Sequence, residues 1–194
     1  MAHAMVQILK QRTKEYLEMY SNVDMQLYRS DMVDAVRAQY SASNHEVITA
    51  GSGASADCLL VDYYAIKVMD SNDWCGAYYD LCERHTNPHS PIVFNRLHGP
   101  KASLVILERL YPAKLSADDA WVLSRYAEDC LDGPRVHATE PLQKSMRGWL
   151  SIVRDERKRL RSASDGVSLP TNDAHRGNWM RRLNGTLVLT DPWY

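Results

Sequence analysis

The chain has 194 residues, 45% of them apolar or aromatic, which suits one domain or two small lobes. Its 23 basic and 24 acidic residues leave a formal net charge of −1, so no broad basic surface for nucleic acid is expected. No stretch approaches the roughly 18 apolar residues of a membrane span. No secretory signal is apparent, and we expect a cytoplasmic protein whose four cysteines are free thiols.

Two helices are predicted first, over residues 5–20 and 31–40. Ser30 is the expected N-cap of the second helix. The apolar residues that recur there at helical spacing are Met32, Val33, Val36 and Tyr40.

The pattern becomes strand-like near residue 46. A helix is expected over residues 73–85, with Trp74, Ala77, Tyr78, Leu81 and Cys82 as its apolar stripe. His98-Gly-Pro predicts a turn between the last two strands of an antiparallel sheet. The predicted strands cover residues 46–50, 58–61, 63–69, 92–94 and 103–108.

The remainder is predicted as helices over 117–131 and 139–162, followed by a hairpin over 179–190. The Arg/Lys-rich run 154–161 is expected to form a solvated helix face. We therefore predict an α+β protein with a cleft between two lobes. Its expected parts are a helical extension (1–45), a β-rich lobe (46–111) and a helical lobe (112–194) that ends in the hairpin.

Two features of the β-rich segment suit phosphate binding. Gly51, Ser52, Gly53 and Ala54 form a glycine loop between two predicted strands, where the backbone can approach phosphates closely. Lys67 stands among apolar strand residues fourteen positions after Gly53. A lysine in such a place needs a partner, and a phosphate group can supply one.

The C-terminal segment supplies candidate catalytic and metal-binding groups. Asp173 and Asn178 are five positions apart in Asp-Ala-His-Arg-Gly-Asn, and Asp191 follows a predicted strand. The carboxylate of Asp173 can accept a hydroxyl proton, whereas Asn178 and Asp191 offer oxygen ligands for Mg²⁺. The hairpin between Asn178 and Asp191 is expected to bring those two ligands together.

These motifs, in this order, resemble those of the protein kinase superfamily. The combination of Gly51-Ser-Gly-Ala-Ser, Ile66-Lys-Val, Leu107-Glu-Arg-Leu, Asp173-Ala-His-Arg-Gly-Asn-Trp-Met and Leu189-Thr-Asp-Pro is most similar to early serine/threonine protein kinases of short-tailed, autographivirus-type bacteriophages. The resemblance covers residues 46–192. It implies a minimal bilobal kinase-like fold, an antiparallel-sheet N-lobe, a truncated helical C-lobe, and the cofactors ATP and Mg²⁺.

The resemblance also implies a role for each matching residue. Lys67 would hold the α- and β-phosphates, with an acid from the 73–85 helix beside it, either Glu83, which is preferred, or Asp80. Asp173 would be the catalytic aspartate. Asn178 and Asp191 would bind Mg²⁺, and the backbone of Glu108 and Leu110 would meet the adenine.

The resemblance implies a host protein as substrate or target complex, without direct nucleic-acid or membrane binding. The metal motif is Asp-Pro rather than Asp-Phe-Gly, and the chain has three residues after Asp191. Substrate binding is therefore expected from the first two helices, from residues 154–161 or from the partner's own surface. Active protein phosphorylation, inhibition of a host complex without catalysis, and phosphorylation of a small molecule all remain open.

Overall fold

The structure is a computed structural model of the chain, and it describes residues 23–54, 56–114, 141–164 and 176–193. Side chains are described from residue 146 in the third of these ranges and from residue 177 in the fourth. The chain divides into two compact units. The first comprises Met1–Asp73 with Val93–Arg109, and the second comprises Trp74–Ile92 with Leu110–Tyr194.

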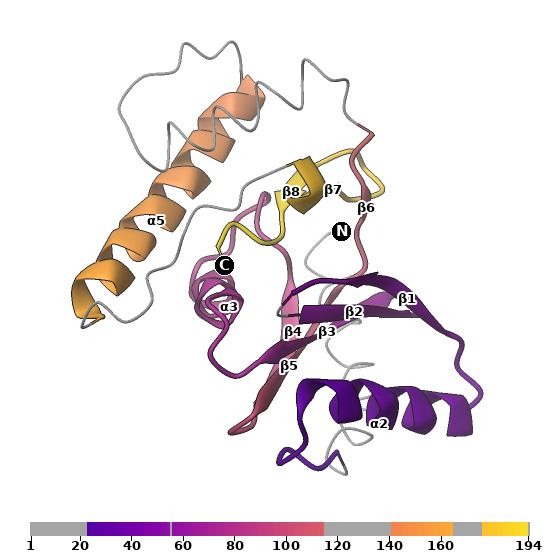
Figure 1. Cartoon of the computed structure of the whole chain (residues 1–194). Helices are drawn as coiled ribbons and strands as arrows, with labels where there is room; N and C mark the ends of the chain where they lie inside the picture. The colour runs from indigo at the N-terminus through magenta and orange to yellow at the C-terminus, as the bar shows by residue number, and fades with distance from the viewer. Residues whose placement is uncertain (1–22, 55, 115–140, 165–175, 194) are drawn as a thin grey trace. The chain divides into compact units, whose positions relative to one another are not determined.

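The first unit is built on a five-stranded antiparallel sheet in the order β1-β2-β3-β5-β4 (Figure 1). β3 and β5 lie inside the sheet, and their residues are almost all buried. The strands are β1 (Val47–Ser52), β2 (Ala56–Val61), β3 (Tyr64–Asp70), β4 (Val93–His98) and β5 (Ala102–Glu108).

Helix α2 (Arg29–Ala42) packs against one face of this sheet. Its buried residues are Met32, Val33, Val36 and Tyr40, which confirms the apolar stripe predicted from the sequence. They share a core cluster with Leu59, Ile66 and other residues of that face. Because side chains alternate along a strand, the residues between these core positions point to the opposite face.

The predicted N-cap of α2 was wrong. The helix begins at Arg29, so Ser30 lies inside its first turn, and the capping position is Tyr28 without a side-chain cap. Arg29 fastens this end of the helix, because its guanidinium contacts the Ala54 carbonyl and the carboxylates of Asp57 and Asp70. A long-range contact, which spacing alone does not reveal, thus sets the start of the helix.

In its described residues, the second unit combines two helices with a small sheet in the order β6-β7-β8. Three tryptophans, Trp149, Trp179 and Trp193, are fully buried in it. A 3₁₀ turn, Arg176–Asn178, leads directly into β7. The other elements are α3 (Cys75–Arg84), α5 (Pro141–Ala163), β6 (Tyr111–Pro112), β7 (Trp179–Arg181) and β8 (Leu187–Leu189).

The buried stripe of α3 differs in part from the prediction. Trp74 and Ala77 are only half-buried, whereas Cys75 and Tyr79 are buried. The helix turns this face toward the end of the C-terminal hairpin, and its side chains contact residues more than 100 positions away. Such contacts rotate the buried face away from the one that local periodicity favours.

The solvated face expected over residues 154–161 was also wrong in part. Glu156 and Arg157 are buried, with relative exposures of 9% and 3%. Glu156 lies against α3, where it pairs with Arg84. An acid in a basic run can therefore mark an internal ion pair rather than a surface.

The predicted α+β class with an antiparallel sheet is confirmed. Predicted helices 5–20 and 117–131 lie outside the described residues. Cys58, Cys75 and Cys82 are free thiols as expected. The helices in the described ranges include none that is both long and apolar enough to cross a bilayer. The three-part domain division remains a prediction.

Candidate phosphate and metal site

Lys67 is placed by the register of the first unit's sheet. It pairs with Cys58 on β2 and with Val105 on β5, and Cys58 pairs in turn with Gly51 on β1. Directly opposed residues share a face of an antiparallel sheet, so Lys67 lies in one row with Gly51. That face is opposite α2, because Lys67 alternates with the core residues Ile66 and Val68. Only 9% of Lys67 is exposed.

The predicted glycine loop is shorter than expected. Gly51 and Ser52 belong to β1, and the turn proper begins at Gly53, whose N–H donates to the Ala56 carbonyl at 2.7 Å. A Cβ at Gly51 would meet no atom within 4 Å, and one at Gly53 would meet only the Ala56 oxygen at 3.4 Å. Exposed backbone with space beside it is what close approach by a phosphate requires.

Glu108 and Leu110 flank the end of β5. Glu108 is the last residue of that strand and pairs with Tyr64, and Leu110 directly precedes β6. The Arg109 N–H between them donates to the Tyr63 carbonyl at 3.1 Å. This contact fixes the path of the backbone at the position where the resemblance implies adenine recognition.

In the second unit, the structure brings Asn178 and Asp191 together. The Asn178 side-chain amide donates to the Asp191 backbone carbonyl at 2.6 Å. The Asn178 backbone carbonyl accepts hydrogen bonds from the Thr190 N–H at 2.9 Å and the Thr190 hydroxyl at 3.1 Å. The hairpin explains this meeting, since β7 pairs with β8 in register from Trp179–Leu189 to Arg181–Leu187. The expected proximity of the two candidate ligands is thus observed.

Helix α3 holds the same strand end from one side. The Tyr78 hydroxyl donates to the Leu189 carbonyl at 2.5 Å, and the Tyr79 hydroxyl donates to the Thr190 carbonyl at 3.1 Å. The Cys75 thiol contacts Asp191 Oδ1 and lies 3.3 Å from the Trp193 carbonyl. We call Cys75, Tyr78 and Tyr79 the α3 donor row.

The segment before β4 holds the hairpin from another side. His89 is buried, its carbonyl accepts from the Leu189 N–H at 3.0 Å, and its Nδ1 lies 2.8 Å from the Leu187 carbonyl. Arg182 donates to the carbonyls of Pro88 and Ser90. A histidine without metal-ligand spacing in the sequence thus has a structural role here.

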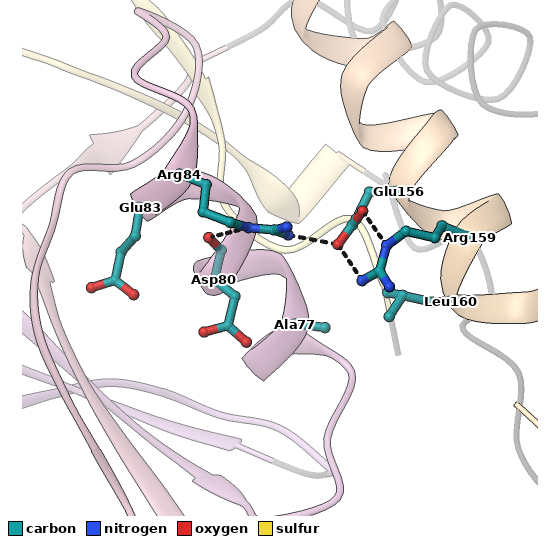
Figure 2. A pocket seen from close by; sticks show the side chains of 7 residues that line it. All are labelled: Ala77, Asp80, Glu83, Arg84, Glu156, Arg159 and Leu160. Atoms are coloured by element: carbon teal, nitrogen blue, oxygen red, sulfur yellow. Dashed lines mark hydrogen bonds and ion pairs between the residues drawn. The ribbon is translucent and has the colours of Figure 1, made fainter. Parts of the chain in front are cut away.

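The predicted acid Glu83 lies at a hollow of about 370 Å³ between α3 and α5. In Figure 2, Asp80, Glu83 and Arg84 extend from α3, and of these Arg84 points toward Glu156 on α5, beside Arg159. Arg84 crosses to Glu156 Oε1 at 2.6 Å. The Nε and Nη2 of Arg159 donate to the two oxygens of Glu156, each at 2.8 Å.

Glu156 is therefore held ionised. Hydrogen bonds from Arg159 and then Arg84 lower the pKa of the Glu156 carboxyl from 4.5 to about 2, although burial opposes the change. The same contact raises the pKa of the Arg159 guanidinium. The charges at this hollow thus form a link between the two helices that persists at neutral pH.

The predicted site residues are divided between the two units. The first unit contains Gly51, Ser52, Gly53, Ala54, Lys67 and Glu108. The second contains Glu83, Leu110, Asn178 and Asp191. Asp173 lies outside the described residues.

The second unit's candidate metal ligands fit magnesium in their chemistry. Asn178 and Asp191 offer an amide carbonyl and a carboxylate, which are hard oxygen donors. Within the described ranges, no group of three or more His, Cys, Asp or Glu side chains could hold a metal ion. Two oxygen ligands suffice for Mg²⁺ where phosphate oxygens and water complete the shell.

Sequence analysis missed the α3 donor row. Cys75, Tyr78 and Tyr79 stand at positions i, i+3 and i+4, which share one helix face. That spacing was a usable signal, but it gives no indication of what the face would contact.

No protein-family model matches this chain, and no curated protein matches it either.

Proposed function

We propose that this protein is an ATP- and Mg²⁺-dependent phosphotransferase with a kinase-like fold. The observation that supports this most is the contact between Asn178 and Asp191, whose spacing first suggested a pair of metal ligands. An amide and a carboxylate at adjacent strand ends form an oxygen-rich pair suited to a cation that bridges phosphates.

Lys67 supports the same proposal from the first unit. A buried lysine on an interior strand, in register with a glycine at the end of an edge strand, matches the order and chemistry of a phosphate-binding sheet. The bilobal kinase arrangement expected from the sequence is part of this proposal.

In this mechanism each residue has one task. Lys67 binds the α- and β-phosphate oxygens through its ammonium group, and Glu83 provides its acidic partner. Asp173 orients the attacking hydroxyl group and accepts its proton. Asn178 and Asp191 would hold Mg²⁺, which would supply positive charge beside the phosphates. The backbone of Glu108 and Leu110 binds the adenine edge.

The substrate class we propose is serine or threonine hydroxyls of host bacterial proteins. This follows the resemblance to early kinases of autographivirus-type bacteriophages, which rests on Asp173-Ala-His-Arg-Gly-Asn and Leu189-Thr-Asp-Pro. In that setting the protein would act in the host cytoplasm, on proteins of host metabolism or defence.

Incubation with γ-labelled ATP and Mg²⁺, alone and with bacterial lysate, tests this function. We expect label on protein, and loss of at least about 100-fold in Asp173→Asn and Asp191→Asn, because each removes a group that acts on the reacting phosphate. Asp62→Asn is a matched control, since Asp62 is an exposed carboxylate between β2 and β3 whose positive φ asparagine tolerates.

The outcomes separate the three functions left open by the sequence. Label on protein in wild type and Asp62→Asn, but not in Asp173→Asn or Asp191→Asn, supports a protein kinase. Label only on a soluble metabolite indicates a small-molecule kinase. A folded wild-type protein that transfers no label contradicts the proposal and favours a binding role.

A further inference from the structure

The contacts around Asp191 differ on its two sides. On the hairpin side, Asn178 and Thr190 hold backbone groups of the strand end. On the α3 side, Tyr78 and Tyr79 also hold backbone carbonyls. The Cys75 thiol, by contrast, contacts the Asp191 carboxylate itself.

The position of Cys75 suits control of a side-chain rotamer. It lies at the start of α3, is 2% exposed, and its sulfur also reaches the Trp193 carbonyl two residues after Asp191. A carboxylate has two oxygens with several lone pairs, so a donor on Oδ1 leaves capacity for a metal ligand bond. Outer-shell partners of this kind orient ligating carboxylates and affect metal affinity.

The helix that supplies the thiol is itself fixed in place. Tyr78 and Tyr79, on the same face, attach α3 to the two residues before Asp191. Arg84 attaches its last turn to Glu156 of α5. The thiol therefore approaches the carboxylate from a rigid support, which is what positioning of a ligand requires.

We propose that Cys75 is a positioning residue for Asp191, whose thiol holds the carboxylate in the orientation that ligates Mg²⁺. This inference rests on the proposed function, because it assumes that Asp191 binds the cation. It assigns to a buried cysteine a task that a small apolar side chain of equal volume could not perform.

The expected effect is a change in the Mg²⁺ requirement. Loss of an outer-shell partner weakens metal affinity about 10- to 100-fold, and a thiol is a weak donor, so we expect about tenfold. Calorimetric titration of ATP at a series of Mg²⁺ concentrations measures this without enzyme turnover. Metal-free ATP binding should not change.

Four variants separate the hydrogen bond from packing. Cys75→Ala removes the donor and leaves space, Cys75→Val removes the donor and fills that space with a slightly larger apolar side chain, and Cys75→Ser restores a donor. We expect the half-saturating Mg²⁺ concentration to rise about tenfold in the first two and to stay within about threefold of wild type in serine. Val36→Ala, a fully buried truncation on α2 of the first unit, is the control and should keep the wild-type Mg²⁺ requirement.

Three results would overturn the inference. A wild-type Mg²⁺ requirement in both Cys75→Ala and Cys75→Val would remove the role of Cys75 and leave the proposed function intact. A raised requirement in alanine but not in valine would assign the effect to packing. Wild-type ATP binding that does not depend on Mg²⁺ would overturn the proposed function, and this inference with it.

Discussion

The two units place their candidate residues by different means. In the first unit, Lys67 is held by backbone register, since β3 pairs with β2 over six residue pairs and with β5 over seven. In the second unit, Asp191 follows a three-residue strand, and side chains of α3 hold the surrounding backbone and the carboxylate.

This difference has a consequence for substitutions. A long antiparallel register depends on many backbone hydrogen bonds, so one side-chain change leaves it intact. A short strand end held by single hydroxyl and thiol donors depends on each of them. We therefore expect substitutions in the first unit to lower stability without changing the register, and substitutions in the second unit to affect both stability and ligand geometry.

The largest effect on stability is expected from Ile66→Ala. Ile66 is fully buried beside Lys67 on β3, and its truncation leaves a cavity that costs about 2–5 kcal/mol. Urea denaturation measures the loss, and hydrogen exchange of β3 amides measures the register. Lasting protection of these amides is the expected result. Loss of β3 protection under native conditions would contradict the claim that backbone register holds Lys67. The position of Lys67 would then depend on a single side chain, as that of Asp191 does.

Tyr78→Phe should have the next largest effect. Burial raises the pKa of Tyr78, and its hydroxyl group donates to the Leu189 carbonyl, which loses this donor in the variant. The expected cost is about 1–3 kcal/mol in urea denaturation. Tyr63→Phe is the control, since Tyr63 is 72% exposed, and should stay within about 0.5 kcal/mol of wild type. Equal effects of the two variants would contradict the role of the α3 donor row.

The smallest effect concerns pH and Glu156. Its pKa is 4.5 unfolded and about 2 folded, so its ion pairs stabilise the protein fully above pH 4.5 and lose this effect as pH falls toward 2. Arg84 and Arg159 are exposed, so solvent screens these pairs and we expect a smaller effect than that of Tyr78→Phe. Glu156→Gln should lower stability at pH 7 and show less loss between pH 4.5 and 2. Parallel pH profiles for the variant and wild type would show that the α3–α5 link contributes nothing.

Much of the first unit was predictable from local pattern. Alternating apolar residues and the His98-Gly-Pro turn predicted the strands, and spacing predicted the buried face of α2. The start of the glycine loop was harder to predict from the sequence. Gly51 and Ser52 belong to β1 because they pair with β2, and not because of their intrinsic strand propensity.

The second unit was less predictable because its decisive contacts are distant in sequence. Local sequence signals did predict the hairpin that begins at Trp179 and its turn at Gly185, where φ is +85°. The same hairpin predicted the proximity of Asn178 and Asp191. The contact of Cys75 with Asp191 spans 116 positions. The pairing of Glu156 with Arg84 spans 72. No local periodicity identifies such partners.

The central claim is that the protein binds ATP through Mg²⁺ held by Asp191. Calorimetric titration of ATP with and without Mg²⁺, in wild type and Asp191→Asn, tests it most directly. The account predicts wild-type binding that strengthens with Mg²⁺ and a variant that has lost this dependence. Equal Mg²⁺ dependence in both proteins, or none in wild type, would contradict it.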